Sequence, residues 1–353
     1  MDIGQLRLHA QGLIHPAFKR PQDVVTYMGA LQAQDFYGSK HAVGIRVPGL
    51  TEQAVDEAVN KGEIIRTWAF RGTLHLVTPM DIRWLVDLLK TRSAQLFKGL
   101  ARTYDIDESL HKKCLKIITK AMQGNQHLTR KEITELLDQK GIHLSEHRVQ
   151  YTLLRASLEG EICHGPMCGK QFSYALLDEW CAAAPVLHRE EALAQLALRY
   201  FTSRGPATVA DFSGWSGLTL TEARKAVEAV KHQLVAFQDY WMSPETAAQQ
   251  GSSHTLLLPP FDEFILGYKD RSAVLEPARN RDVFTVNGIF KAVMVQQGKV
   301  LGTWKRTLGK NNVSIALSPF KALKKSQHSA FEAAAQAYAA YLQTALKSIT
   351  VEQ

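Results

Sequence analysis

The sequence predicts a mainly α-helical protein with small β wings, an α+β fold made of tandem winged-helix domains and a C-terminal β element. Two observations favour this fold class. Amphipathic helical patterns recur along the 353 residues, and each recurrence closes in a short stretch rich in β-forming residues. From about residue 255 the sequence pattern changes to runs of residues typical of β-strands. An apolar content of 45% is enough for an ordinary core in each domain.

The clearest copy of the pattern lies in the second quarter of the chain. A helix capped by Thr129 breaks at Gly141, and a longer helix then runs to Leu158. The following stretch, ICHGPMCGKQFSYALL (162–177), predicts two strands joined by a Gly/Pro turn. This order predicts a helix-turn-helix unit with a wing.

The third copy begins after a break at Ala184–Pro185. One long helix stops at the sequence RGP (204–206), and a short helix capped by Thr208 follows. The sequence TLTEARKAVEAV (219–230) predicts a further helix, and QLVAFQDYWMS (233–243) supplies the closing strands.

The first copy is the most diverged. Helical stretches are expected near residues 3–13, 21–33 and 51–60, followed by a hairpin in IIRTWAFRGTLHLV (64–77). In the C-terminal element, two strands are expected around Gln297–Gly298, and a final helix over 329–346. The predicted domains are therefore 1–115, 116–184, 185–250 and 251–353.

The charge balance favours a polyanionic partner. Lys and Arg number 42 against 34 for Asp and Glu, which gives a formal charge of +8. Four cysteines argue against a disulfide scaffold, and CHGPMCG (163–169) lacks the second ligand pair of a zinc site, so we expect no metal and no cofactor. No secretory signal or membrane-length apolar run is visible, which favours a cytoplasmic protein without membrane association.

Four motifs together indicate a family. The sequences LQAQD, RGTLHLV, RYFTSRGPATVADFSGWSGL and LLPPFDEFILGYKDR resemble those of the tandem winged-helix DNA glycosylases of the AlkZ and YcaQ type, over about residues 5–345. The catalytic signature of that family is Gln, an apolar residue, then Gln or Asp. Gln32, Ala33 and Gln34 match the Gln-ending form of the AlkZ branch, whereas Asp35 lies one residue too late for the other form.

The resemblance implies an activity and a partner. It implies that the protein removes bulky N7-alkylated purines from double-stranded DNA, including interstrand crosslinks, with Gln32 and Gln34 as catalytic residues. We expect a monomer that acts on DNA in the nucleoid, with three winged-helix units around a concave basic channel. Such a channel would handle a large adduct with little extrusion of the base.

Two amides are chemically weak, and this weakness favours a particular leaving group. An ordinary base needs a general acid to leave the sugar. A purine alkylated at N7 already carries a positive charge and departs as a neutral base. Two glutamine carbonyls that hold a water near C1′ can then suffice, and we expect an abasic site as product.

Geometry sets a condition on this mechanism. Residues two apart point to nearly opposite sides of a helix, so the motif should lie at a helix end or a turn. A shift of one residue would bring the Asp35 carboxylate to the water instead. The amine of Lys40 offers a Schiff-base alternative.

Further site residues are expected in three groups. Arg71, Thr73 and His75 share one face of the expected hairpin, either as a structural cluster or as a polar wall of the lesion pocket. The stretch FDEFILGYKDR concentrates Asp262, Glu263, Asp270 and Arg271, where a carboxylate serves either catalysis or, as the favoured interpretation, a buried Asp–Arg brace between domains. The candidate DNA-binding cations are Lys40, Arg46, Lys299, Lys305 and Arg306, the last three on an expected DNA-facing hairpin over 286–306.

Two alternatives stay open at this point. Winged helices are mostly used by non-enzymatic DNA-binding proteins such as transcription regulators, and a fold does not fix a function. The second alternative is a glycosylase-like fold that binds adducts without cutting.

Overall fold

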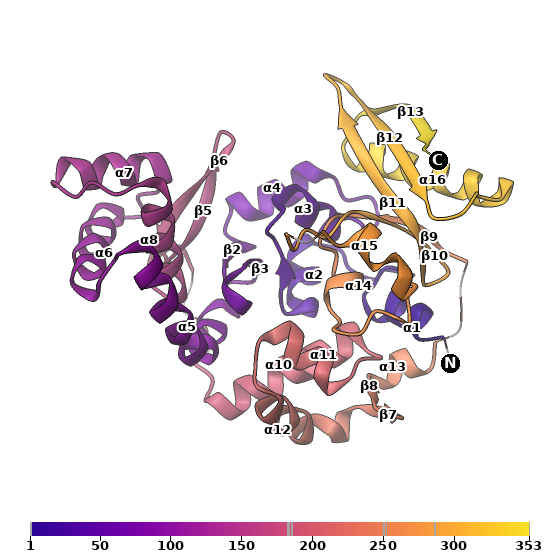
Figure 1. Cartoon of the computed structure of the whole chain (residues 1–353), viewed down its shortest axis with the longest axis horizontal. Helices are drawn as coiled ribbons and strands as arrows, with labels where there is room; N and C mark the ends of the chain where they lie inside the picture. The colour runs from indigo at the N-terminus through magenta and orange to yellow at the C-terminus, as the bar shows by residue number, and fades with distance from the viewer. Residues whose placement is uncertain are drawn as a thin grey trace. The chain divides into compact units, whose positions relative to one another are not determined.

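The computed structural model describes residues 2–181, 184, 186–249, 251, 253–285 and 287–352 (Figure 1). The chain divides into two compact units. Unit 1 comprises Met1–Asp56 and Ala194–Gln353, and unit 2 comprises Glu57–Leu193. These units do not coincide with the four predicted domains, because the N-terminal segment packs with the C-terminal segment instead of with the residues that follow it. The predicted break at Ala184–Pro185 includes Pro185, which lies outside the described residues.

Unit 2 contains the winged helix that the sequence predicts most clearly. Its members are α6 (Glu108–Met122), β4 (Leu128–Thr129), α7 (Arg130–Gln139), α8 (Glu146–Leu158), β5 (Ile162–Cys168), β6 (Gln171–Leu176) and the short α9 (Leu177–Trp180). Thr129 caps α7 in a capping box with Glu132, as expected. Apolar residues of the three long helices and β5, among them Ile118, Ile133 and Leu153, share one buried core.

The wing differs from its prediction in one detail. Gly165–Pro166 lies inside β5, and the turn between the strands falls after Cys168. The pairing of β5 with β6 shifts register between His164 and Met167. A bulge of this kind accommodates proline, which has no N–H to donate to the neighbouring strand.

The remaining elements of unit 2 precede the winged helix. The antiparallel pair β2 (Ile65–Trp68) and β3 (Leu74–Val77) confirms the expected hairpin. The long helix α5 (Ile82–Tyr104) is absent from the sequence prediction. Its first part has a helical alternation, because the polar residues Arg83, Asp87 and Lys90 are spaced three or four apart between buried apolar residues; the sequence prediction omits a helix that the pattern indicates.

The third predicted copy also forms a winged helix, and most of it lies in unit 1. It consists of α10 (Arg189–Arg204), α11 (Val209–Ser216), α12 (Leu220–Val230), the 3₁₀ turn η2 (Lys231–Gln233), and the strands β7 (Val235–Phe237) and β8 (Tyr240–Met242). Thr208 and Thr219 cap α11 and α12 in capping boxes. The short α13 (Pro244–Ala247) follows.

A five-stranded sheet dominates the C-terminal part of unit 1. Its order is β13-β12-β11-β10-β9, formed by β9 (Thr255–Leu258), β10 (Val293–Gln296), β11 (Lys299–Leu308), β12 (Asn312–Pro319) and β13 (Ala345–Val351). The long helix α16 (Lys325–Tyr341) packs Phe331 and Ala335 against the sheet residues Trp304 and Ile315. The short α14 (Glu263–Leu266), η3 (Pro277–Arg279) and α15 (Asn280–Val283) lie between β9 and β10 in the chain.

The predicted final helix is displaced along the chain. It begins at Lys325 instead of 329 and ends at Tyr341 instead of 346, because Gln343 adopts a left-handed φ of 53° that reverses the chain. Residues from Ala345 onward then pair in parallel with β12. The predicted helix covers only the first two residues of this strand, ALKSITV (345–351), which ends in the strand-forming residues Ile, Thr and Val.

The N-terminal part of unit 1 contains four helices. They are α1 (Ile3–Ala10), α2 (Pro21–Met28), α3 (Phe36–Gly44) and α4 (Glu52–Asn60), whose last residues enter unit 2. The second predicted helix, 21–33, stops at Met28 because Gly29 has a φ of 73°. The two-residue strand β1 (Leu31–Gln32) and the unpredicted helix α3 follow.

No membrane-spanning helix occurs within the described part of the chain, whose helices are too short or too polar to cross a bilayer.

Candidate functional site

The two glutamines occupy the end of β1 and the turn before α3, so the predicted position at a helix end is confirmed. Gln32 is 7% exposed, whereas Gln34 is an exposed residue. The side-chain Oε1 of Gln32 accepts a hydrogen bond of 2.8 Å from the backbone N–H of Gln34. The first glutamine therefore shapes the turn that presents the second.

Asp35 is the N-cap of α3. Its Oδ1 accepts a hydrogen bond of 2.9 Å from the backbone N–H of Gly38. This contact is the usual reason for an aspartate at the start of a helix. The carboxylate therefore has a structural task that accounts for its presence beside the motif.

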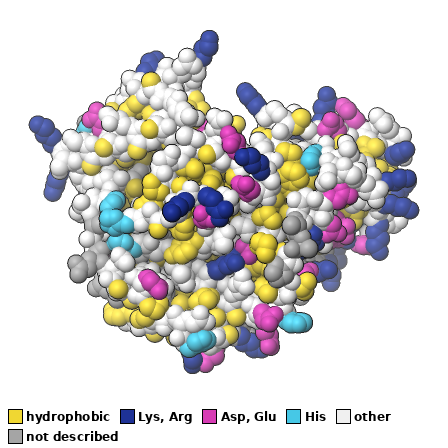
Figure 2. Space-filling model, turned by 180° about the vertical axis from the view of Figure 1, so that it is seen from behind, with side chains coloured by type: hydrophobic (Ala, Val, Ile, Leu, Met, Phe, Trp, Pro, Cys, Tyr) yellow, Lys and Arg dark blue, Asp and Glu magenta, His cyan; other side chains and the backbone are white. Residues whose placement is uncertain are grey.

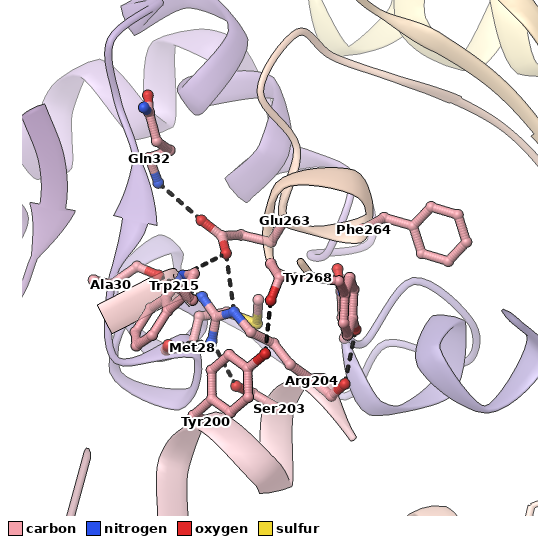
Figure 3. Close-up of polar contacts among 12 residues, drawn as sticks. Met28, Ala30, Gln32, Tyr200, Ser203, Arg204, Trp215, Glu263, Phe264 and Tyr268 are labelled. Atoms are coloured by element: carbon pink, nitrogen blue, oxygen red, sulfur yellow. Dashed lines mark hydrogen bonds and ion pairs between the residues drawn. The ribbon is translucent and has the colours of Figure 1, made fainter. Parts of the chain in front are cut away.

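A buried carboxylate holds the backbone of the motif. Glu263, at the start of α14, accepts a hydrogen bond of 3.1 Å at Oε1 from the backbone N–H of Gln32. Its Oε2 accepts from Nε of Arg204 at 2.9 Å and from Nε1 of Trp215 at 3.0 Å. Figure 3 shows the Gln32 side chain pointing away from Glu263, so only its backbone meets the carboxylate.

The guanidinium of Arg204 extends this support along the chain. Its two terminal nitrogens donate to the carbonyl oxygens of Met28 and Ala30, each at 2.7 Å (Figure 3). Arg204 and Glu263 are both fully buried. The ion pair thus fixes the chain at three alternate positions, residues 28, 30 and 32, immediately before Gln34. In the sequence, Arg204 is noticed only as the end of a helix. A better signal is the acidic pair Asp262–Glu263 after Pro259–Pro260, because two carboxylates in an apolar stretch need buried arginines as partners.

A second buried ion pair lies beside the first. Arg46 donates two parallel hydrogen bonds to Asp262, of 2.9 and 3.0 Å, and also contacts Gln11 and the Ala42 carbonyl. Arg46 is 0% exposed, so the prediction that it binds DNA is wrong. Both acidic residues instead form the expected Asp–Arg type of brace, which joins parts of three predicted domains inside unit 1.

Lys40 is likewise internal. Its Nζ lies 2.8 Å from Asp56 and 3.2 Å from Glu52, and the residue is 2% exposed. A buried ammonium group with two carboxylate partners is available neither for a DNA phosphate nor, as a free amine, for a Schiff base. Its predicted roles in DNA binding and in covalent chemistry are therefore replaced by a structural one.

The expected DNA-facing hairpin also has a different role at its tip. Gln297 and Gly298 form the turn between β10 and β11, as predicted, but Gly298 packs on α1 so closely that a Cβ there would lie 2.4 Å from the Gly4 carbonyl carbon. Lys299 donates to the Ala273 carbonyl at 2.7 Å. Gly298 is therefore an internal contact of unit 1, whereas the Lys299 side chain is exposed and its binding to DNA stays a prediction.

Lys305 and Arg306 lie near the other end of β11, on a cavity of about 360 Å³ within unit 1. Arg306 donates to the hydroxyl of Tyr338, and its guanidinium lies 5.7 Å from the Tyr37 ring centre. Burial raises the pKa of the Tyr338 hydroxyl to about 12. Further residues of the lining are Asp35, Tyr37, Gly38, Phe261, Phe290, Lys291 and Trp304. The cavity thus combines aromatic walls with cations beside the start of α3.

The three hairpin residues belong to unit 2. Arg71 is exposed and has a left-handed φ of 57°, and the Thr73 hydroxyl donates to the Phe70 carbonyl at 3.0 Å. His75 is fully buried, with Nδ1 2.9 Å from the Thr73 carbonyl. They therefore do not share one face of a strand, and their part in a lesion pocket stays a prediction.

The cations of the surface are mixed with acidic groups. On the face shown in Figure 2, Lys and Arg side chains stand among Asp and Glu side chains. Many basic residues pair locally with carboxylates on the same helix, as Lys112 does with Glu108 in α6. Exposed pairs of this kind contribute little to stability.

Comparisons with known proteins agree with this architecture. A family model described as DNA glycosylase AlkZ-like matches residues 25–341. The interstrand DNA cross-link repair glycosylase of Streptomyces sahachiroi is 26% identical over 313 residues, covering 80% of this chain and 81% of that protein. The solved structure of the Streptomyces sahachiroi DNA glycosylase AlkZ has a TM-score of 0.82 at 21% identity, covering 99% of this chain and 98% of that one. The predicted α+β fold class is thereby confirmed.

Proposed function

Because the chain belongs to the AlkZ-like DNA glycosylase family and is thus a DNA repair glycosylase, we propose that its substrates are N7-alkylated purines in double-stranded DNA. It hydrolyses the N-glycosidic bond and leaves an abasic site. Family membership favours this enzyme over a winged-helix regulator and over a protein that only binds adducts. We further propose that it acts as a monomer on the nucleoid DNA of the cytoplasm.

In the proposed reaction, a water oxygen forms a bond to C1′ of the deoxyribose while the bond from C1′ to N9 breaks. The electron pair of that bond neutralises the positive charge of the alkylated purine, which leaves as a neutral base. The water releases its proton to solvent. Gln34 holds the water at C1′ as a hydrogen-bond acceptor, and Gln32 maintains the turn that places Gln34.

One observation supports this assignment most directly. Gln34 is exposed on a braced turn, while the carboxylate and the amine that follow it most closely in sequence, those of Asp35 and Lys40, are engaged as a helix cap and in ion pairs. A site built from an amide suits a leaving group that arrives already charged. It cannot activate a neutral purine, and this limit protects undamaged DNA.

We include bulky adducts and interstrand crosslinks among the substrates. The similarity to the interstrand DNA cross-link repair glycosylase of Streptomyces sahachiroi supports this extension. Lys305 and Arg306, on the cavity beside α3, are the proposed contacts to phosphates of the bound duplex.

The test is a duplex that carries a single N7-methylguanine, incubated with the protein and then treated with alkali. We expect strand breaks at the lesion, faster than spontaneous depurination, and none at unmodified guanines. Strand breaks without alkali would contradict the simple hydrolysis. Breaks at the spontaneous rate would contradict the proposed substrate.

A further inference from the structure

We propose that Glu263 and Arg204 are positioning residues of the glycosylase reaction, which set the place of Gln34 through the backbone of residues 28–34. This proposal rests on the proposed role of Gln34 at the water. Neither residue touches the substrate, because both are fully buried in unit 1.

The carboxylate of Glu263 is fully committed to this geometry. Oε2 is fixed by two donors from outside the motif, Arg204 at 2.9 Å and Trp215 at 3.0 Å. Oε1 faces the motif and accepts the Gln32 N–H at 3.1 Å. A group held on one side and bound to the motif on the other transmits its own position to the Gln32 peptide (Figure 3).

The Gln32 side chain carries this position forward to Gln34. Its Oε1 accepts the Gln34 N–H at 2.8 Å, so the peptide and the side chain of Gln32 are anchored at opposite ends of the residue. A displacement of the Gln32 peptide therefore moves the turn on which the exposed Gln34 amide stands. Misplacement of a catalytic group by about 1 Å can cost about 10²-fold in rate.

Arg204 fixes two further positions of the same backbone segment. By donating to the carbonyls of Met28 and Ala30, it fixes the chain on the same side as Glu263 fixes residue 32. Met28 is the last residue of α2, and Ala30 follows the turn at Gly29, so the two contacts hold the chain on both sides of that turn. The segment has a strand of only two residues, and the ion pair adds three hydrogen bonds to its backbone.

The chain contains a matched control. Asp262 and Arg46 form another fully buried carboxylate–guanidinium pair in unit 1. Asp262 directly precedes Glu263 in the chain. The contacts of Arg46 go to Gln11 and Ala42 instead of the motif. Loss of either pair should destabilise the protein similarly, and only one loss should disturb Gln34.

The experiment compares Glu263→Gln with Asp262→Asn in the full chain. Both substitutions keep the size of the side chain and remove one charge. For each we would measure the free energy of unfolding in urea, the Kd for lesion-bearing duplex, and the single-turnover rate constant on N7-methylguanine. The wild type and Gln34→Ala are measured alongside.

We expect both variants to lose stability and to keep the wild-type Kd. The rate constant of Glu263→Gln should fall by about 10²-fold, whereas that of Asp262→Asn should stay within about threefold of wild type. Equal losses in the two variants, or a wild-type rate in Glu263→Gln, would overturn the positioning role. If Glu263→Gln does not fold, Trp215→Phe decides: it removes one donor to Glu263 and keeps an aromatic ring, and a rate constant unchanged in it counts against the proposal.

Failure of the proposed function looks different. In that case the wild type does not cut the lesion, or Gln34→Ala cuts it at the wild-type rate. The positioning role alone fails when the wild type cuts, Gln34→Ala does not, and Glu263→Gln behaves like Asp262→Asn.

Discussion

Gln32 Oε1 accepts a hydrogen bond of 2.8 Å from the backbone N–H of Gln34, so the two glutamines of the motif are not equivalent. The buried Gln32 has a lone pair committed to the turn, while Gln34 is exposed. Their substitution should therefore separate activity from stability.

Replacement of Gln34 by alanine should remove activity without cost to the fold. The residue is exposed, so we expect the free energy of unfolding to change by no more than about 0.5 kcal/mol. The single-turnover rate constant on N7-methylguanine should fall by about 10²-fold or more, since the water loses its acceptor. Binding to the lesion duplex, followed by fluorescence anisotropy, should be unchanged; a variant that cuts normally would exclude Gln34 from the reaction.

Replacement of Gln32 by alanine should affect both properties. The Gln34 N–H loses its partner, and we expect a loss of about 1 kcal/mol in the free energy of unfolding together with a lower rate constant. Urea unfolding of both alanine variants measures the difference. Equal stability of the two would show that the Gln32 contact does not hold the turn in solution.

Asp35 should be replaceable by asparagine. The side-chain amide oxygen of the introduced asparagine can still accept the Gly38 N–H, so we expect Asp35→Asn to keep its stability and its rate. Asp35→Ala loses the cap of α3 and should lose about 1 kcal/mol. Urea unfolding and the single-turnover assay measure both variants. A stable but inactive Asp35→Asn would instead assign chemistry to the carboxylate.

Removal of the cations near the cavity should weaken DNA binding in a salt-dependent way. If Lys305 and Arg306 each neutralise one phosphate, replacing both by glutamine lowers the slope of log K against log salt by about 2. Lys299→Gln is the control, because this lysine of the same strand binds the Ala273 carbonyl. The measurement is binding to undamaged duplex across a salt series, and equal slopes in the two variants would contradict the assignment.

His41 should make the stability of the protein depend on pH. Burial lowers its pKa from 6.5 to about 3; Asp262 opposes the shift, and Arg306 and Arg46 add to it. The unfolded chain takes up a proton below about pH 6.5, whereas the folded protein keeps His41 neutral down to about pH 3. As the pH is lowered through this window, the free energy of unfolding should therefore decrease, by about 1.4 kcal/mol per pH unit from this group.

The check is urea unfolding at pH 5 and pH 7.5 in wild type and His41→Phe. The phenylalanine can pack among the rings of Trp304, Tyr338 and Tyr341, which surround the imidazole. We expect a weaker pH dependence in the variant. The same dependence in both proteins would show that His41 titrates normally in the fold.

Local signals account for what the sequence predicts correctly. Thr129 and Thr208 begin helices because a hydroxyl and an acidic side chain three residues on satisfy the first N–H groups, and this pattern is visible in a few letters.

Distant partners account for the errors. From the sequence near it, Arg46 is predicted to be a surface cation, because its carboxylate partner, Asp262, lies 216 positions later. The same holds for the last strand, β13, whose pairing with β12 has no local signature. Glu263 and Arg204 lie 59 positions apart, so their joint hold on residue 32 could not be predicted from either stretch.

The division of unit 1 into two chain segments has a consequence for synthesis. Unit 2 is continuous, so all its contacts can form once Leu193 has left the ribosome. The N-terminal segment cannot complete its contacts at that point, because Asp262, the partner of Arg46, and Glu263, the partner of Gln32, have not yet been synthesised. At a synthesis rate of about 5–20 residues per second, roughly 10–40 s pass between the synthesis of Arg46 and that of Asp262. A nascent chain that stops before Asp262 should therefore hold a folded unit 2 and a glutamine turn that lacks its hydrogen bond to Glu263.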